Sequence, residues 1–274
     1  MVVKQDIIHA INELEIKATD TVIVHSSLKS FGIVDGGPDT VIDAFLEVLT
    51  DGTLIFPTLR QKDFFNAYNN WDIKTTPSDV GLISETFRKR AGALRSNQET
   101  HSVSAMGVRA QYITEAHNEG KPRIGMWGDY AFSYNSPWQK LYELNGKIVM
   151  LGVTLVYNTE KHFPEHKLVN DILDALPSEE LWQEARNKLV RFGDDYDPNG
   201  AKVWPLHDGL KAQAELEKLG LVKSTMCGPC KIITVDAKPF VDYMYDQLLN
   251  HPKEWVSEGM ASWIQNYSKK GLLK

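Results

Sequence analysis

The sequence predicts an α/β protein with a central, largely parallel β-sheet flanked by helices. Two short apolar runs, residues 22–24 and 54–56, are bounded by turn-forming residues, as is typical of strands buried on both faces of a sheet. Between them, residues 39–49 carry apolar side chains at helical spacing, and Asp51-Gly52 then supplies a stop and a turn. Together these segments predict a βαβ crossover, the connection that joins parallel strands.

Other segments continue the alternation of strands and helices. Residues 1–16 form an amphipathic pattern that predicts a helix rather than a signal peptide. The apolar side of a helix over residues 81–90 is expected to face inward, through Leu82, Ile83, Thr86 and Phe87. The remaining strands are expected at residues 147–153 and 231–235, and the remaining helices at residues 181–193, 207–219, 239–249 and 255–266.

The length of 274 residues suffices for a sizeable core, and we expect one domain that spans residues 1–274. Two long stretches, residues 61–79 and 120–136, interrupt the alternation and are rich in aromatic residues, Asn or Gly. Long ordered loops in compact domains often border binding sites. Both stretches are therefore predicted to be active-site loops.

Composition narrows the classes of partner. The chain has 30 Lys and Arg against 36 Asp and Glu, a net charge of −6, which argues against a nucleic-acid surface and suits a polycationic substrate. No run approaches the roughly 20 apolar residues of a membrane span. We expect a cytoplasmic protein that binds neither membrane nor nucleic acid, and a homodimer is left open.

The sequence contains no G-x-G-x-x-G, G-x-x-x-x-G-K or G-x-S-x-G motif, and so gives no support for a dinucleotide enzyme, a P-loop NTPase or an elbow-type serine hydrolase.

Polar residues follow the first predicted strand. His25, Ser26 and Ser27 are thereby placed at the carboxyl end of the sheet, where open α/β folds bind ligands. Gly32 and the pair Gly36-Gly37 allow the backbone to approach a ligand closely, and the next helix offers unpaired N–H groups. On these residues alone, a ligand site and a tight loop before a capped helix are equally supported.

Residues 95–103 concentrate hydrogen-bonding side chains around one fixed cation, Arg95. Such a loop suits a phosphate or a carbonyl group. A solvated loop held together by serine and threonine is an equally good interpretation of the same residues.

Both cysteines of the chain belong to the pentapeptide C-G-P-C-K, residues 227–231, which matches a thioredoxin-type redox motif. In that chemistry the first cysteine lies at a helix N-terminus, and the helix dipole lowers the pKa of its thiol. Here residues 231–235 are a β-branched run that predicts a strand, so the required helix is missing. A structural turn is the favoured interpretation, and a dithiol oxidoreductase is the weaker alternative.

Residues 162–166 spell H-x-x-E-H, the motif of inverted zinc peptidases. Pro164 is tolerated only in the first turn of a helix, so His162 is expected at the N-terminal edge of that helix, which argues against this zinc site. His162 and Glu165 can still face one cleft, with the carboxylate accepting from one ring nitrogen and the other nitrogen free as a base. The pair alone favours a structural histidine over a general base.

Several blocks resemble, in order along the chain, the aminoglycoside 3-N-acetyltransferase family. The similarity extends from about Val22 to the final predicted helix. The matching residues are His25-Ser26-Ser27-Leu28, Phe31-Gly32, Gly36-Gly37, Gly52-Thr53, Pro57-Thr58, Thr76-Pro77-Ser78, Gly81, Arg95-Ser96, His101-Ser102-Val103, Ala105-Met106-Gly107, Ser136-Pro137, Lys140-Leu141, Leu151-Gly152-Val153, Asn158-Thr159, His162 and Glu165.

The resemblance implies the antibiotic N-acetyltransferase fold, which differs from that of the common N-acetyltransferase superfamily. It also implies acetyl transfer from acetyl-CoA to the 3-amino group of a 2-deoxystreptamine aminoglycoside. An ammonium group is not a nucleophile, so a base is needed, and the resemblance favours His162, oriented by Glu165. Thr159 and backbone N–H groups near residues 26–28 are the candidate donors to the developing oxyanion. Transfer is expected to be direct.

The resemblance and the motif positions together give a set of expected site residues. The acetyl-CoA site is expected to include His25, Ser26, Ser27, Leu28, Phe31, Gly32, Arg95, Ser96, Ser102 and Val103. The substrate site is expected to include Asp72, Asn158 and Glu160, and no metal ligand is assigned. Acidic residues there would attract an amino sugar.

One block departs from the family pattern. Family members commonly have His-Pro where this chain has Gln98-Glu99, which predicts a flexible, charged loop in place of one shaped by proline. Local contacts to substrate or cofactor are therefore uncertain. The alternatives are a relative that binds CoA but acts on another amine or lacks aminoglycoside activity, and, less favoured, the zinc peptidase and the oxidoreductase.

Overall fold

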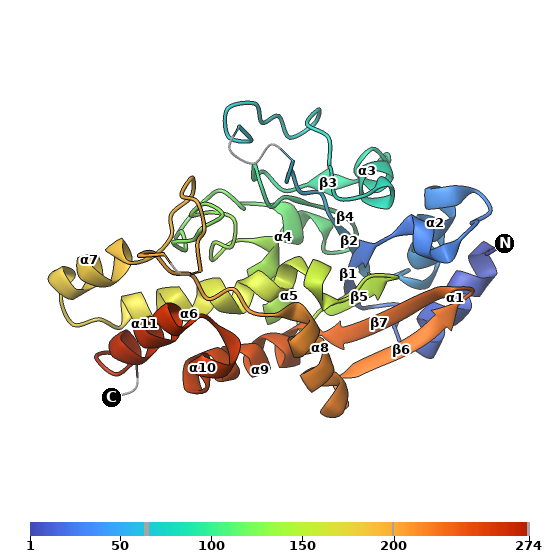
Figure 1. Cartoon of the computed structure of the whole chain (residues 1–274). Coiled ribbons are helices and arrows are strands. Elements are labelled where there is room, and N and C mark those ends of the chain that lie inside the picture. Colours follow the sequence, from blue (N-terminus) through green and yellow to red (C-terminus); the bar gives the residue numbers. More distant parts are fainter. Residues whose placement is uncertain (63–65, 199, 273–274) are drawn as a thin grey trace.

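A computed structural model describes residues 1–62, 66–198 and 200–272. Its strands form one seven-stranded sheet in the order β3-β4-β2-β1-β5-β7-β6 (Figure 1). The strands are β1 (Thr21–Ser26), β2 (Thr53–Pro57), β3 (Leu94–Arg95), β4 (Val103–Gly107), β5 (Lys147–Leu151), β6 (Val222–Cys227) and β7 (Cys230–Asp236).

Helices cover both faces of this sheet (Figure 1). The α-helices are α1 (Lys4–Glu13), α2 (Gly37–Val48), α3 (Leu82–Arg88), α4 (Ala110–Thr114), α5 (Pro137–Glu143), α6 (His162–Asp174), α7 (Glu179–Asn187), α8 (Gly209–Lys218), α9 (Ala237–Asn250), α10 (Pro252–Trp255) and α11 (Glu258–Ser268). Short 3-10 helices are η1 (Leu28–Phe31), η2 (Leu155–Tyr157) and η3 (Thr159–Lys161). None of the described helices is long and apolar enough to cross a membrane.

The centre of the sheet is parallel, and its flanks are antiparallel. Strand β1 pairs in parallel with β2 on one side and with β5 on the other. Strand β4 then adds to β2, and β7 to β5, in the antiparallel direction. The predicted α/β fold class and the βαβ crossover through α2 are confirmed. The carboxyl ends of β1, β2 and β5 consequently meet at one edge of the sheet.

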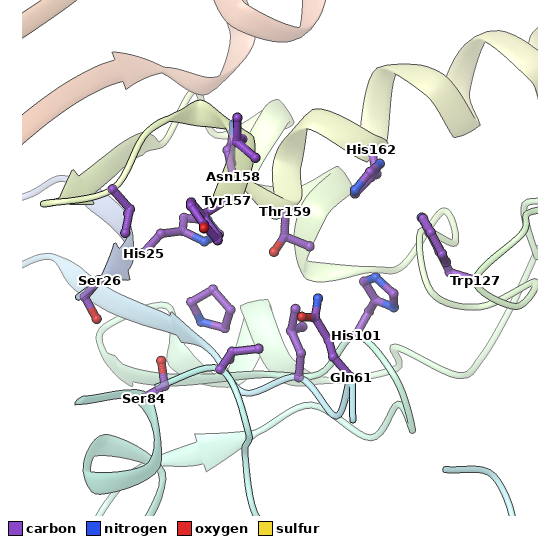
Figure 2. A pocket seen from close by; sticks show the side chains of 15 residues that line it. His25, Ser26, Gln61, Ser84, His101, Trp127, Tyr157, Asn158, Thr159 and His162 are labelled. Carbon is purple, nitrogen blue, oxygen red and sulfur yellow. The ribbon is translucent and has the colours of Figure 1, made fainter. Parts of the chain in front are cut away.

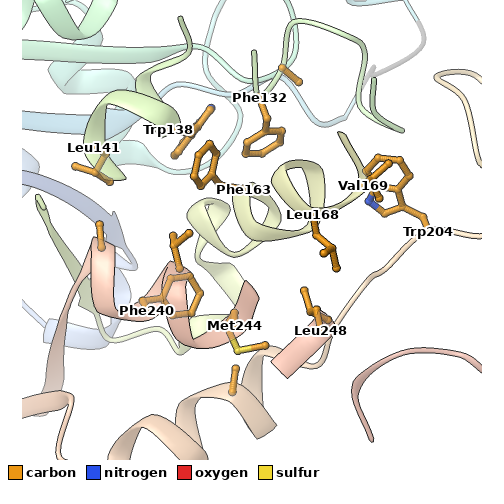
Figure 3. Close-up of a cluster of buried hydrophobic side chains, with 14 of the residues drawn as sticks. Phe132, Trp138, Leu141, Phe163, Leu168, Val169, Trp204, Phe240, Met244 and Leu248 are labelled. Carbon is orange, nitrogen blue, oxygen red and sulfur yellow. The ribbon is translucent and has the colours of Figure 1, made fainter. Parts of the chain in front are cut away.

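Two hydrophobic layers enclose the sheet, which explains why its central strands are continuously apolar. Ile23 belongs to one layer, and its neighbours Val22 and Val24 belong to the other. Helices α1, α2 and α3 supply the layer around Val22. The opposite layer is built around α5, α6 and α9, with Trp138, Leu141, Phe163, Leu168, Phe240 and Met244 packed together (Figure 3).

The structure differs from the expected elements at three places. The helix expected over 181–193 ends at Asn187, because the chain then turns and Leu189 forms a bridge with Val203. The helix expected over 255–266 is divided, and the hydroxyl of Ser257 caps α11 by accepting from the backbone N–H of Met260. Leu82, expected to face inward, is 59% exposed.

Candidate functional site

A cavity of about 510 Å³ opens at the carboxyl ends of β1 and β2. Figure 2 shows side chains from separate segments of the chain converging on it. The lining residues are His25, Ser26, Pro57, Leu59, Gln61, Val80, Ser84, His101, Trp127, Val153, Val156, Tyr157, Asn158, Thr159 and His162. This is the location that the parallel centre of the sheet predicts for a ligand.

Helix α6 begins at His162 and places Pro164 in its first turn, as predicted. His162 Nδ1 lies 2.8 Å from Glu165 Oε2. With the Nδ1–H donating to the carboxylate, Nε2 is left without a proton and able to accept one. The side chain of His162 is 17% exposed and that of Glu165 is fully buried, so the imidazole lines the cavity and the carboxylate lies behind it.

A second histidine holds the other oxygen of Glu165. The backbone N–H of His207 donates to Oε1 at 3.1 Å, and His207 Nδ1 lies 2.8 Å from the same atom. Burial alone would raise the pKa of Glu165, but the contacts with His162 and His207 outweigh it and hold that pKa well below its ordinary value. The carboxylate is therefore charged at neutral pH.

The pKa of His162 is lowered by burial, and Glu165 offsets part of this effect. The imidazole is consequently neutral at pH 7, which is the state that a general base requires. The ring of Trp127 meets that of His162 edge-on, with centroids 5.3 Å apart. The structure thus presents a neutral, oriented imidazole beside an aromatic wall.

Thr159 and Asn158 lie in the segment just before α6. Thr159 lies in η3, and Figure 2 shows its side chain between His162 and His25. The side chain of Asn158 caps η3 by accepting from the backbone N–H of Glu160 at 3.0 Å. Glu160, expected at the substrate site, is fully buried and is not among the residues that line the cavity.

Only part of the predicted acetyl-CoA site reaches the cavity. His25 and Ser26, at the end of β1, line it. His25 Nε2 is buried and has no hydrogen-bond partner among the described residues. The backbone N–H of Ser27 instead donates to Leu151, and Phe31 packs in the core. Leu28, Phe31 and Gly32 do not line the cavity.

Arg95, expected to contact the cofactor, holds surrounding backbone together. Its guanidinium donates to the carbonyls of Thr76 at 2.5 Å and Thr58 at 2.7 Å, and to Ser102 Oγ at 3.1 Å. Burial lowers the pKa of Arg95 to about 9. The structure does not bring Arg95, Ser96, Ser102 or Val103 into the cavity. A cofactor role for these four residues stays a prediction.

The loop at Gln98-Glu99 is held by hydrogen bonds of the Gln98 side chain. Gln98 is fully buried, and its Oε1 accepts from the backbone N–H groups of Thr100, at 2.9 Å, and of His101. The amide thereby fixes the backbone that carries His101 to the cavity. The Gln98 side chain orders the turn because it satisfies the backbone donors, whereas Glu99 stands at the position where proline is expected.

Asp72, the other acidic residue expected at the substrate site, caps its own turn. Its Oδ1 accepts from the backbone N–H of Lys74 at 3.0 Å and of Thr75 at 2.7 Å. Asp72 is exposed and does not line the cavity. Of the two predicted active-site loops, 120–136 supplies Trp127, and 61–79 supplies Gln61. Residues 63–65 of the second loop lie outside the described part of the chain.

Among the site residues that the sequence analysis missed, three have contacts that bear on the chemistry: His101, Trp127 and His207. His101 was part of a matched block but received no role. Trp127 lay in a predicted loop without a signal of its own. His207 was assigned to the start of a helix, and its contact with Glu165 spans 42 positions of the chain, a separation that no local pattern records.

The C-G-P-C motif and the second histidine of the H-x-x-E-H motif both lie away from the cavity. Cys227 ends β6 and Cys230 begins β7, so the C-G-P-C motif is a β-hairpin turn and lacks the helix of redox chemistry. Both thiols are free and buried, and burial raises the pKa of Cys227 to about 11 and that of Cys230 to about 12. His166 bonds through Nδ1 to the carbonyl of His162 at 2.8 Å and does not line the cavity.

Comparisons with known proteins agree on one family. The sequence model of the family described as aminoglycoside 3-N-acetyltransferase matches residues 23–248. An aminoglycoside N(3)-acetyltransferase III from Salmonella sp is 27% identical over 270 residues, 89% of this chain and 91% of the relative. The SPbeta prophage-derived aminoglycoside N(3')-acetyltransferase-like protein YokD from Bacillus subtilis (strain 168) is 26% identical, over 78% of this chain and 77% of the relative.

Solved structures agree on the fold. The structure described as AAC-IIIb binary with CoASH has a TM-score of 0.70 and 20% sequence identity. The superposition covers 93% of the present chain and 98% of the chain of that structure.

Proposed function

Because this chain belongs to the aminoglycoside 3-N-acetyltransferase family, an acyltransferase family that uses acetyl-CoA, we propose that it acetylates a primary amine with His162 as general base. The observation that carries this proposal is the pair formed by His162 and Glu165 at the cavity wall, with 2.8 Å between Nδ1 and Oε2. A neutral imidazole with its Nδ1 proton held by a buried carboxylate is suited to accept a proton at Nε2.

Acetyl-CoA supplies the acetyl group as a thioester. His162 Nε2 removes a proton from the ammonium form of the acceptor, and the free amine can then attack the thioester carbonyl. The Thr159 hydroxyl is the proposed donor to the oxygen that becomes negative, since Thr159 lines the cavity. The backbone N–H of Ser27, also expected to take part, already donates to the carbonyl of Leu151. As the C–S bond breaks, the proton held by His162 passes to the departing thiolate, and the attacking nitrogen releases its second proton to solvent, which leaves a neutral amide and CoA thiol.

Transfer without an acetyl-enzyme intermediate is proposed because the chain offers no suitable nucleophile at the site. Cys227 and Cys230 lie in the β6–β7 hairpin, do not line the cavity and have raised thiol pKa values. Ser26 makes no hydrogen bond to a histidine of the described part of the chain, and is proposed as a donor to the cofactor. The unpartnered Nε2 of His25 is a further polar contact that suits an amide-bearing arm such as that of CoA.

The first candidate acceptor is the 3-amino group of a 2-deoxystreptamine aminoglycoside, because the relatives are named aminoglycoside N(3)-acetyltransferases. Asn158 and Thr159 line the cavity and would contact it, whereas Asp72 and Glu160 do not reach the cavity. A different amine is the second candidate. It is favoured by one observation: among the described residues that line the cavity, none is acidic.

Replacement of the base tests the proposal. His162→Ala is expected to lower kcat for CoA release with any accepted amine by about 10²- to 10⁴-fold, the usual contribution of a positioned base. The matched control is His9→Ala, because His9 is exposed and pairs only with Glu13 on the outer face of α1. Full acetyl transfer by His162→Ala, or an isolable acetylated enzyme, would contradict this mechanism.

A further inference from the structure

The charge of the cavity wall restricts the acceptor, an argument that rests on the proposed acetyl transfer. Polar lining residues are neutral amides, hydroxyls and imidazoles, and the remainder are apolar. Burial lowers the pKa of His25 to about 3 and places that of His101 well below its ordinary value, so neither ring adds a charge. The described cavity wall therefore carries no fixed charge of either sign.

Two carboxylates close in the structure to lining residues, Glu165 and Asp79, already have other partners. Glu165 is enclosed between His162 and His207. Asp79 accepts from the backbone N–H groups of Gln61, at 2.9 Å to each oxygen, and of Lys62 at 2.7 Å.

Two further acids lie outside the wall. Asp171 pairs with Lys167 at 2.5 Å and with the hydroxyl of Tyr245 at 3.0 Å. Asp129, two residues from Trp127, is exposed and does not line the cavity. Asp63 lies outside the described residues. No described acid lines the cavity, Glu160 and Glu85 included, so the described wall offers no carboxylate to an ammonium group.

Such a wall is unfavourable for a polycation. A charge that leaves water without a counter-charge or hydrogen-bond acceptors is strongly destabilised. One ammonium group of the acceptor loses its proton to His162 during the reaction, but every further ammonium would stay charged. An aminoglycoside brings several of these groups, so its binding inside this cavity lacks the compensation that carboxylates would give.

The apolar part of the cavity wall favours an acceptor that is itself largely apolar. Leu59, Val80, Val153 and Val156 supply aliphatic surface, and Trp127 stands beside the ring of His162. Two lining residues, Tyr157 and Val156, also reach solvent, with exposed fractions of 67% and 38%. The volume of about 510 Å³ must hold both the acetyl end of the cofactor and the acceptor, which favours a small acceptor.

We infer that the acceptor is a small primary amine with a single ammonium group on an apolar or aromatic body, of the arylalkylamine class. Trp127 and the aliphatic wall would bury the body, and the amino group would lie at His162.

A matched pair of amines isolates the effect of charge. Cyclohexylamine and cis-1,3-diaminocyclohexane share one ring and differ by one ammonium group. With purified protein and acetyl-CoA, CoA release is expected to give a kcat/KM about tenfold or more higher for the monoamine. Phenethylamine is expected to exceed a 2-deoxystreptamine aminoglycoside by about 100-fold. An aminoglycoside or the diamine as the better substrate, with activity lost in His162→Ala, would overturn the inference and leave the proposed function standing.

A different result would show that the proposed function itself is wrong. Acetyl transfer to none of these amines would contradict both the function and the inference. A variant then tests the physical reason: Gln61→Glu adds a carboxylate to the wall and is expected to shift the kcat/KM ratio toward the diamine by about tenfold. Gln61→Asn, which shortens the side chain without adding charge, is the control. An unchanged ratio in Gln61→Glu would contradict the electrostatic explanation.

Discussion

Glu165 is the residue on which the proposed base depends. It is fully buried, and each of its oxygens lies 2.8 Å from a histidine ring nitrogen, one from His162 and one from His207. Removing one member of such a buried charged network leaves the others without compensation. The carboxylate also raises the pKa of His162 against the lowering effect of burial.

Glu165→Gln should therefore weaken the base without much change in volume. We expect kcat/KM to fall about tenfold or more. The acid limb of the kcat/KM profile against pH reports the pKa of His162, so loss of the carboxylate should move this limb to lower pH. Glu47→Gln, at an exposed pair with Lys4, is the control. A profile that keeps its acid limb would show that Glu165 does not set the pKa of the base.

The sequence anticipates one half of this network for a physical reason. His162 and Glu165 are one helical turn apart, and Pro164 fixes where the helix begins, so their contact is a local property of the chain. His207 reaches Glu165 through the tertiary fold. Glu160 and Asp72 were expected to contact the substrate because both are acidic. In the structure Glu160 is buried in the interior, and Asp72 accepts hydrogen bonds within its own turn.

At the scale of elements, α6 positions both the base and the wall facing it. Asn170, on α6, accepts from the backbone N–H of Ile124 and donates to the carbonyl of the same residue, both at 2.9 Å. This contact docks the 120–136 loop, which supplies Trp127 to the cavity. Gly125 lies beside it, and a Cβ at that position would be 2.2 Å from His166 Nε2.

Gly125→Ala should consequently displace the loop from α6. His166 cannot yield easily, because its ring packs between Phe132 and Trp204. We expect about 1–3 kcal/mol of lost stability in denaturant unfolding, and a raised KM for the acceptor as Trp127 moves. The control is Gly259→Ala in α11, where the new Cβ would meet Val203 at 3.1 Å and alanine suits the helix. Equal effects of both substitutions would contradict the close packing proposed for Gly125.

Elements with a clear pattern of apolar residues were predicted from the sequence, and elements with a weak pattern were not. The buried strands β1 and β2 appear as continuous apolar runs because both faces are covered. Strand β6 was missed, since it is an edge strand with mostly exposed, polar residues. Strand β3 has two residues, too few for any period to be detected.

For the whole molecule, the parallel centre of the sheet could be predicted from the sequence, but the antiparallel flanks could not. The βαβ unit around α2 is local in the chain and determines one parallel pairing. The pairing of β2 with β4 joins residues such as Pro57 and Val103, separated by a long stretch of chain that includes α3 and β3. The site is assembled from several of these segments, so its lining residues depend on long-range packing.

Global stability should carry a pH dependence from Glu160. This carboxyl group is fully buried, and neither of its oxygens has a hydrogen-bond partner among the described residues. Burial raises its pKa well above the ordinary value, with Arg123 offsetting part of the effect. Between the ordinary pKa and the folded-state pKa, the unfolded chain releases the proton and the folded chain keeps it. Stability therefore falls as the pH rises through this range.

Glu160→Gln removes the titration while keeping the shape and a neutral side chain. Below the ordinary carboxyl pKa both folding states of the wild type are protonated, so the variant should have nearly the same Tm at pH 4. At pH 8 it should be more stable, with each unit of pKa shift worth about 1.4 kcal/mol and each kcal/mol about 2–4 °C in Tm. Thermal unfolding across this pH range measures the difference, and Glu258→Gln, in the first turn of α11, is the control. A loss at pH 8 would show that Glu160 is charged in the folded protein and compensated by Arg123, and a gain independent of pH would show that the titration of Glu160 is not coupled to folding.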